Sequence, residues 1–277
     1  MSFRERARQR TPFPFERVRY LLSRLHGSRL QKDKRLRFVT MNGQRFKRLV
    51  LCDSHLAHTI ERNLEEFQDT GFFPPLVTRY ERELWLEFVD GLRIETVDEE
   101  LVGRVAEFYA TLHARRPRLV EAEESGFPAR LRRDLRFLGQ VGVLEESARR
   151  DLEVAARRLV PESVWVGFDY TDPVLKNFVA LRDGSGICAI DVDGLADEQM
   201  LGMGAMKACL RWLEPYRERF FAELVRRDAP DLRAYLPFVE LSFLARWTKR
   251  SFFEHKWKAI DPKRFERFRG DQRTSGS

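Results

Sequence analysis

The chain has 277 residues, of which 43% are hydrophobic and 34% charged, and its formal net charge is +7. Such a composition is typical of folded globular proteins and excludes disordered and fibrous classes, and the length suffices for one large domain or two lobes. No apolar run approaches the roughly 20 residues that cross a bilayer, and the N-terminal residues lack the apolar stretch of a secretory signal. These features predict no transmembrane segment. The three cysteines are scattered and lack metal-ligand spacing, which is typical of buried thiols in a reducing compartment, so we expect a cytoplasmic protein.

The positive charge is concentrated at the two ends of the chain. Residues 1–50 carry 15 Lys and Arg against three acidic residues, and residues 246–269 interleave basic and aromatic side chains. Such ends suit contact with the phosphate groups of a substrate, an anionic membrane surface or nucleic acid. Solvated helix faces are the alternative. We expect residues 1–34 to form a basic N-terminal extension.

The first predicted element is a β-hairpin. Asn42 and Gly43 separate two β-prone runs, residues 35–41 and 44–51, and both residues tolerate the positive φ of a tight turn. A helix capped by Asp53 or Ser54 follows, and then two further strands at 76–80 and 84–89. The order strand, strand, helix, strand, strand predicts a small lobe over residues 35–90.

The remaining residues, 91–277, predict a larger and mainly helical lobe with a basic C-terminal segment. Thr96 and Glu99 are spaced as a capping box for the first of its helices. The other expected elements are helices at 128–139 and 144–159, strands at 163–169, 178–181 and 187–190, and helical structure over 198–268. After Asp193 and Gly194 the chain is expected to enter a helix directly.

Three polar residues around the predicted 178–190 hairpin carry the candidate chemistry. Asn177 follows Asp172 by five positions, and Asp191 ends the next strand, so their side chains should converge at one edge of the hairpin. Phosphoryl transfer needs one carboxylate to accept or orient the proton of the attacking hydroxyl. It also needs an amide oxygen and a second carboxylate to hold Mg²⁺ against nucleotide phosphates. The alternative is that these are ordinary turn and capping residues.

This segment resembles the catalytic loop of the kinase-like phosphotransferases. In the aminoglycoside and choline phosphotransferases and the bacterial lipopolysaccharide sugar kinases, the loop reads His-x-Asp-x-x-x-x-Asn and is followed by Ile-Asp. Here Tyr170 to Asn177 and then Ile190-Asp191 are similar, and the Ile190-Asp191-Val-Asp193 ending resembles the lipopolysaccharide kinases in particular. Residues 84–91 resemble the hinge between the lobes, and 105–114 the helix that follows it. The resemblance covers about residues 35–195 in the family's order.

The resemblance implies an α+β, two-lobed protein-kinase-like fold and a role for each matching residue. It makes Asp172 the catalytic base, Asn177 a metal ligand, Asp191 the principal metal ligand and Asp193 a second one. ATP and Mg²⁺ are the implied cofactors. The backbone of Glu87, Phe88 and Val89 would contact the adenine edge.

On the third strand of the family pattern, the resemblance implies that Lys47 holds the α- and β-phosphates and is held in turn by Glu61. Arg45 and Arg48 compete with Lys47 for this role, and Glu65 competes with Glu61.

The sequence departs from the family pattern at three places. Tyr170 stands where the family has His, which mainly braces the loop. Gly27-Ser28 is the only candidate for a Gly-rich loop. Lys176, just before Asn177, is unusual: either it neutralises the transferring phosphoryl group as a catalytic residue, or it lies on the surface.

We therefore predict an ATP-dependent kinase that phosphorylates a hydroxyl of a small-molecule or glycolipid acceptor, such as a lipopolysaccharide-type sugar. No activation segment of the protein-kinase type is present in the sequence, so a protein substrate is not expected. The basic ends favour an anionic acceptor or peripheral contact with the inner membrane face. Two alternatives stay open: a pseudokinase that binds nucleotide or a partner without turnover, and a basic nucleic-acid-binding protein, for which steep salt dependence is expected.

Overall fold

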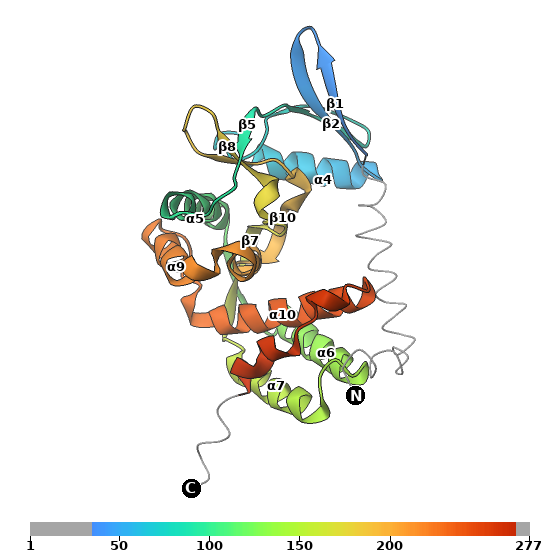
Figure 1. The fold of residues 1–277 in the computed structure, drawn as a ribbon, viewed down its shortest axis with the longest axis vertical. Coiled ribbons are helices and arrows are strands. Elements are labelled where there is room, and N and C mark those ends of the chain that lie inside the picture. The colour runs from blue at the N-terminus through green and yellow to red at the C-terminus, as the bar shows by residue number, and fades with distance from the viewer. Residues whose placement is uncertain (1–34, 270–277) are drawn as a thin grey trace. The chain divides into compact units, whose positions relative to one another are not determined.

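The computed structural model describes residues 35–269 (Figure 1). These residues form two compact units: residues 119–165 with 232–269, and residues 35–118 with 166–231. The expected lobe boundary near residue 90 falls inside the second unit and stays a prediction. The predicted basic extension, residues 1–34, lies outside the described residues.

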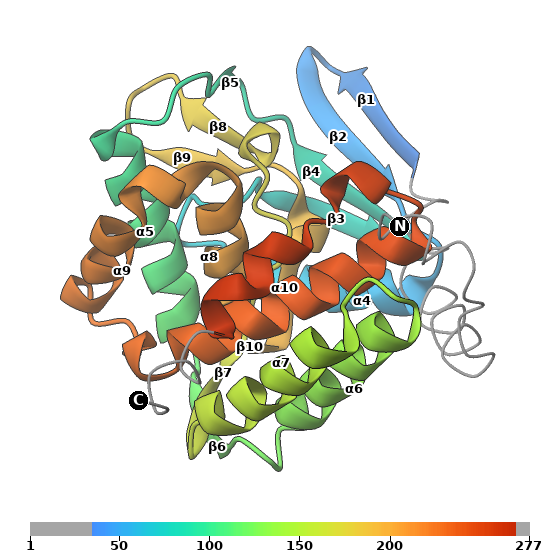
Figure 2. The same cartoon turned by 60° about the horizontal axis from the view of Figure 1, so that its bottom comes forward.

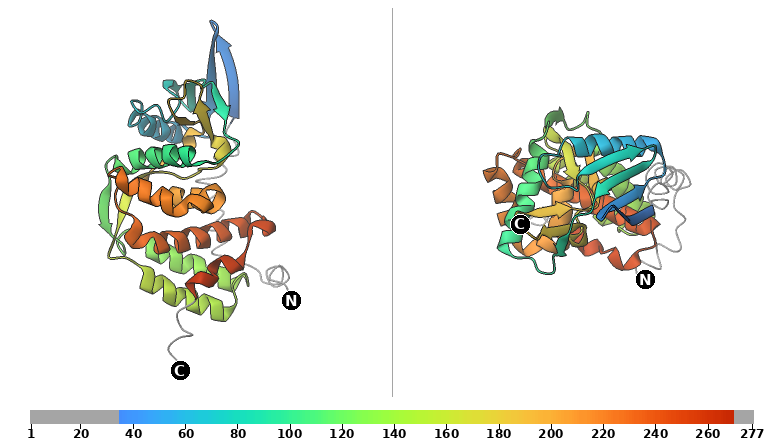
Figure 3. Two further views of the ribbon diagram at one scale, coloured as in Figure 1. Left: turned by 60° about the vertical axis from the view of Figure 1, so that its left-hand side comes forward. Right: turned by 90° about the horizontal axis from the view of Figure 1, so that it is seen from above.

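The predicted hairpin is confirmed. Strand β1 (Arg35–Met41) pairs antiparallel with β2 (Gln44–Val50), from Arg35 opposite Val50 to Met41 opposite Gln44. Asn42 and Gly43 have φ values of 52° and 79°, as a two-residue turn that follows the twist of its strands requires. Figure 3 shows the two strands, drawn in blue, running alongside each other.

The hairpin belongs to a four-stranded antiparallel sheet of order β1-β2-β4-β3, with β3 at Leu76–Tyr80 and β4 at Glu83–Glu87 (Figure 2). Helix α4 (Ser54–Glu65) packs against β3 and β4 through an apolar side that includes Ile60. Its N-cap is Asp53, whose carboxylate accepts a hydrogen bond from the Leu56 N–H at 2.7 Å. The predicted small lobe of sheet and helix is therefore present.

Helix α5 (Glu99–Ala114) begins two residues later than a cap at Thr96 requires, so the predicted capping box is wrong. The N-cap is Asp98, which has an extended backbone and accepts from the Leu101 N–H at 2.8 Å. An aspartate directly before the first helical turn provides this acceptor without the Thr96 hydroxyl. The predicted apolar side of the helix is buried, and α5 packs against α9 (Arg217–Arg226).

The predicted strands that frame the candidate loop are present as β7 (Ser163–Tyr170), β8 (Phe178–Leu181) and β9 (Ile187–Ala189). Three strands were not predicted: β5 (Gly91–Arg93), which pairs with β8, β10 (Leu195–Met200), which pairs with β7, and β6 (Arg118–Glu121). The chain after Gly194 thus forms a strand, and the expected direct entry into a helix is wrong. The segment has little intrinsic strand propensity, and its pairing with β7 is interrupted by an irregularity between Ala196 and Gln199.

Beyond β10 the second unit continues into helix α8 (Met203–Ala208) and a π-helical turn, η3 (Cys209–Leu213). The other unit contains three packed helices, α6 (Phe127–Gln140), α7 (Glu146–Leu159) and α10 (Leu236–Phe253), along with the 3₁₀ segment η7 (Pro262–Phe268) and most of strand β6 (Arg118–Glu121). The helices predicted at 128–139 and 144–159 are therefore confirmed. Within residues 35–269, no helix has both the length and the apolar character to cross a membrane.

A cluster of buried aromatic rings lies under the candidate loop. Phe108 of α5 contacts Phe73, Tyr170 and Phe178 with ring centroids 5.4–5.7 Å apart. Tyr170 ends β7 and Phe178 begins β8, so the two residues that flank the loop are both fixed in this core. Tyr170 and Phe178 meet Phe108 edge to face, and such ring contacts stabilise a core beyond the burial of their area. The loop between them is thus supported at both ends.

The buried thiols give a prediction that depends on pH. Burial raises the pKa of Cys188 and of Cys209 to about 12, so both thiols stay protonated at pH 8. Because the thiolate is the nucleophile, we expect neither cysteine to react with iodoacetamide at pH 8 in the folded protein. Both should react once the protein is unfolded in urea, where the thiol pKa returns to about 8.5. Mass spectrometry of the alkylated peptides measures this; modification of either cysteine in the native state would contradict the described packing.

Candidate active site

The loop between β7 and β8 brings Asp172 and Asn177 together. The Asn177 amide Nδ2 donates to the backbone oxygen of Asp172 at 3.0 Å and to its carboxylate Oδ2 at 3.3 Å. Asn177 lies in a single 3₁₀ turn, η1 (Leu175–Asn177), and is only 7% exposed, whereas the Asp172 side chain is 48% exposed. A buried amide therefore orients a carboxylate that stays accessible to a substrate.

Asp191 is held next to this pair by backbone contacts. The Ile190 N–H donates to the backbone oxygen of Asn177 at 2.8 Å, which fixes the end of β9 against the loop. The Tyr170 hydroxyl donates to the backbone oxygen of Asp191 at 3.0 Å. The structure thus brings the backbone of Asp191 beside the loop that carries Asp172 and Asn177.

Tyr170 marks the centre of this cluster. Burial raises the pKa of its hydroxyl well above the usual value, and the negative charges of Asp191, Asp172 and Asp193 raise it further. The hydroxyl therefore stays protonated and keeps its hydrogen bond to Asp191. Tyr170 also accepts on its backbone oxygen from the hydroxyl of Tyr109 at 3.1 Å. The tyrosine at this position braces the loop, which is the task the family pattern gives to histidine.

The oxygen atoms of this cluster suit a magnesium ion. Mg²⁺ prefers carboxylate and amide oxygens, and it keeps waters or substrate oxygens as its remaining ligands. Because Asn177 uses its amide nitrogen on Asp172, its carbonyl oxygen is the atom left for a metal. The donor set of Asn177, Asp191 and Asp193 therefore fits the ion. This set has two carboxylates and one amide; within residues 35–269, no group of three or more His, Cys, Asp and Glu side chains is arranged to hold a metal.

Of the three basic residues on β2, Lys47 is the one that reaches the site. Its side chain is buried, and its ammonium donates to the backbone oxygen of Ile190, directly before Asp191. Arg45 instead lies over the Phe88 ring at 3.8 Å from its centroid. Arg48 forms an ion pair with the carboxylate of Glu83 on β4.

The structure corrects the expected pairing of Lys47 with Glu61. The Glu61 carboxylate accepts from the Arg79 guanidinium and contacts His58 at 3.2 Å, and it forms no ion pair with Lys47. Although partial burial opposes ionisation, the hydrogen bonds from Arg79 and His58 hold the pKa of Glu61 below its usual value. Arg79 on the neighbouring strand β3 offers a guanidinium that matches the carboxylate geometry, so it takes this partner.

The hinge residues differ in how their amides are used. The Glu87 N–H donates to the backbone oxygen of Pro75 at 2.9 Å, and the Phe88 N–H donates to that of Arg45 at 3.2 Å. Of the three, only Val89 has an N–H without a hydrogen-bond partner among residues 35–269. The amide that the structure leaves for a ligand is therefore that of Val89.

Gly91, two residues further, packs so closely on strand β8 that a Cβ atom there would lie 2.6 Å from Val179 Cγ2. The absence of a side chain at this position therefore brings the end of the hinge and β8 together.

Two further expectations have different outcomes. Lys176 is exposed and forms no hydrogen bond or ion pair with the described residues, so the structure does not bring it into the cluster. The candidate Gly-rich segment, Gly27-Ser28, lies outside the described residues.

A residue that the sequence did not reveal, Lys207 of α8, lies 2.5 Å from the Asp172 carboxylate. Nothing in its sequence context signals this contact, because it depends on how α8 docks.

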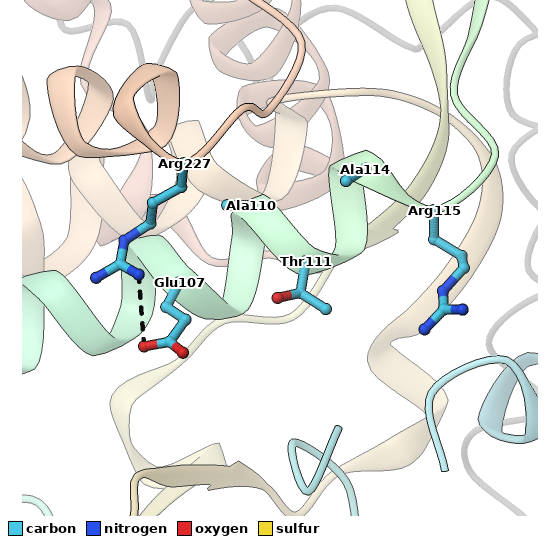
Figure 4. A pocket seen from close by; sticks show the side chains of 6 residues that line it. All are labelled: Glu107, Ala110, Thr111, Ala114, Arg115 and Arg227. Carbon is cyan, nitrogen blue, oxygen red and sulfur yellow. Dashed lines mark ion pairs between the residues drawn. The ribbon is translucent and has the colours of Figure 1, made fainter. Parts of the chain in front are cut away.

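A separate hollow of about 490 Å³ lies along α5 (Figure 4). Glu107 and Arg227 form an ion pair at 3.7 Å on one side of it, and Arg115 lies at the other. None of the predicted site residues lines it, and we assign it no function.

Neither a protein-family model nor a curated protein matches this sequence. Solved structures do match. A macrolide 2′-phosphotransferase from Brachybacterium faecium is 12% identical, with a TM-score of 0.59 over 85% of this chain and 86% of that one. A choline kinase from Streptococcus pneumoniae is 13% identical, with a TM-score of 0.59 over 84% and 88%. An aminoglycoside phosphotransferase from Alicyclobacillus acidocaldarius is 13% identical, with a TM-score of 0.58 over 85% and 90%.

The chain therefore has the fold of the kinase-like phosphotransferases, with an antiparallel sheet and a helix before the hinge and mainly helices after it. This confirms the predicted fold class. At 12–14% identity the likeness establishes the fold and not the chemistry, because one fold supports many activities.

Proposed function

We propose that this chain is an ATP-dependent phosphotransferase that moves the γ-phosphoryl group to a hydroxyl of a non-protein acceptor. The observation that carries the proposal is the cluster of Asp172, Asn177 and Asp191 around the buried Tyr170 hydroxyl. The cluster contains the proton acceptor and the hard oxygen ligands that phosphoryl transfer needs. It lies in a fold shared with phosphotransferases that are named for small-molecule acceptors.

In this proposal each residue has one task. Asp172 receives or orients the proton of the attacking hydroxyl, and its exposed carboxylate is accessible to an acceptor. Asn177 and Asp191 hold Mg²⁺, with Asp193 as a second carboxylate. The bound ion would neutralise phosphate charge and orient the γ-phosphoryl group. Lys176, at the surface of the same loop, remains a predicted catalytic residue without a contact that supports it.

The nucleotide would be held from the small lobe. We propose that Lys47, whose ammonium donates to the backbone oxygen of Ile190 directly before Asp191, binds the α- and β-phosphates. The N–H of Val89 and the backbone oxygen of Glu87 would bind the adenine edge, next to Phe88. One similar structure, an aminoglycoside 2′-phosphotransferase with a TM-score of 0.54, is a GDP complex, so GTP belongs beside ATP in any binding test.

We propose a small-molecule acceptor. The similar structures are named for macrolides, aminoglycosides and choline, which favours a small molecule with a hydroxyl group. A glycolipid acceptor of the lipopolysaccharide-sugar type is a narrower hypothesis. It draws support from the basic ends of the chain, which suit an anionic acceptor at the inner face of the membrane.

A pseudokinase is the second candidate, and one observation favours it. The Glu61 carboxylate is paired with Arg79 and not with Lys47, the partner that the family pattern implies. A pseudokinase would bind nucleotide without consuming it.

An acceptor screen separates the two candidates. Purified protein is incubated with Mg²⁺ and ATP or GTP against panels of aminoglycosides, macrolides, amino alcohols and sugar-containing lipids, and phosphate transfer is followed by ³¹P NMR. We expect a new phosphomonoester resonance with at least one acceptor. Nucleotide binding without a phosphomonoester or free phosphate would favour the pseudokinase.

A further inference from the structure

Helix α8 docks on the end of β7 with no room for a side chain at the contact. The Gly204 N–H donates to the buried Asp169 carboxylate at 2.8 Å. A Cβ atom at Gly204 would lie 2.1 Å from the backbone oxygen of Tyr170. The start of α8 is therefore fixed against the residues that immediately precede the catalytic loop.

One helical turn later, this docking places Lys207 against the loop. Its ammonium donates to the Asp172 carboxylate Oδ1 at 2.5 Å and to the backbone oxygen of Thr171 at 3.0 Å. The Lys207 side chain is 10% exposed. Desolvating an unpaired ammonium is costly, so a lysine at this depth depends on the anion beside it.

The same segment contacts the loop at a third point. In the π-helical turn η3, the Trp212 indole N–H donates to the backbone oxygen of Pro173 at 2.7 Å. Gly204, Lys207 and Trp212 thus contact successive positions of β7 and the loop, residues 169 to 173. Of the three, only Lys207 brings a charge to the proposed proton acceptor.

We propose that Lys207 is a positioning residue for phosphoryl transfer, one that holds the Asp172 carboxylate toward the acceptor hydroxyl. The inference rests on the proposed function. Lys207 binds Oδ1 and the Asn177 amide approaches Oδ2, so the two contacts together define the plane of the carboxylate. In the transfer, the acceptor oxygen bonds to the γ-phosphorus, the bond from that phosphorus to the ADP oxygen breaks, and the acceptor proton goes to Asp172. A fixed ammonium at this place also adds positive charge near the transferred group.

The test compares Lys207→Met and Lys207→Arg with wild type and with Lys258→Met, which changes an exposed lysine far along the chain. Affinity for Mg²⁺-ATP is measured by calorimetry and turnover by phosphate release with ATP and water or an acceptor. We expect Lys207→Met to lower kcat about 10- to 100-fold with a Kd for Mg²⁺-ATP within about threefold of wild type. Lys207→Arg should recover part of the rate, and Lys258→Met should match wild type.

A double-mutant cycle distinguishes positioning from a general structural role. If Lys207 acts through Asp172, then Lys207→Met adds little further loss of kcat in an Asp172→Asn background. Additive losses, an unchanged kcat in Lys207→Met, or an increased kcat that reveals an inhibitory contact would each overturn the inference. If Lys176→Met lowers kcat and Lys207→Met does not, the inference is also overturned, because the positive charge that assists transfer would then come from Lys176.

A measurement without turnover keeps the inference testable if the rate is too low to follow. In hydrogen exchange of the nucleotide-free protein, peptides covering residues 171–177 should exchange faster in Lys207→Met, and those of β1 and β2 should not. Unchanged exchange in the loop would contradict positioning by Lys207. Failure of wild type to bind any nucleotide would count against the proposed function, and normal binding with no effect of Lys207 would count against this inference alone.

Discussion

We expect Asp172→Asn to lower kcat about 10²- to 10⁴-fold, the range that proton transfer by a positioned side chain contributes. The amide keeps the shape of the carboxylate but cannot accept the proton, and it loses the ion pair with Lys207. Nucleotide affinity should change less than about threefold, because the proposed metal ligands Asn177 and Asp191 are unchanged. Initial rates at saturating Mg²⁺-ATP, together with calorimetric Kd values, measure both effects.

Asp228→Asn is a matched control for this substitution. Asp228 is exposed and has a φ of 57°, a conformation that Asn adopts as readily as Asp, so the same chemical change should leave kcat and stability as they are. If Asp172→Asn retains kcat within about fivefold of wild type, Asp172 is not the proton acceptor.

The second large effect concerns stability. We expect Gly204→Ala to lower the free energy of unfolding by about 3 kcal/mol, because overpacking in a buried contact adds to the loss of a hydrogen bond to a buried carboxylate. The new methyl group would lie 2.1 Å from the Tyr170 backbone oxygen and 2.6 Å from Asp169 Oδ1, so the helix has to move away. Urea unfolding followed by circular dichroism and by tryptophan fluorescence measures the change.

Gly103→Ala provides the matched control. Gly103 lies within helix α5, and a Cβ atom there meets nothing within 4 Å. Replacing a helical glycine by alanine at an open position should raise the free energy of unfolding by about 0.5–1 kcal/mol. Equal effects of the two substitutions would show that α8 does not dock on β7 as described.

The features that could be predicted from sequence are those that depend on neighbouring residues. The Asn42-Gly43 turn required only two residues with positive φ between two β-prone runs. The cluster of Asp172, Asn177 and Asp191 required only one loop and one hairpin, because the β8–β9 turn returns the chain to its start.

The features that could not be predicted depend on contacts between distant segments. The residues of strand β10 have weak strand propensity, and they form a strand because they pair antiparallel with β7. The Glu61 carboxylate pairs with Arg79 and not with Lys47 because β3 packs against α4. Neither segment has a sequence pattern that indicates this contact. Lys207 reaches Asp172 only because Gly204 lets α8 approach the loop.

Mg²⁺-dependent nucleotide binding at Asp191 is the central claim, and a thermal-shift titration of wild type and Asp191→Ala with ATP and GTP tests it most directly. Stabilisation by a ligand follows RT ln(1 + [L]/Kd) and reaches about 2.7 kcal/mol at a ligand concentration of 100 Kd. We predict a rise in Tm for wild type that requires Mg²⁺ and is strongly reduced in Asp191→Ala. No rise with either nucleotide, or an equal rise in the variant and without Mg²⁺, would contradict the assignment of this site.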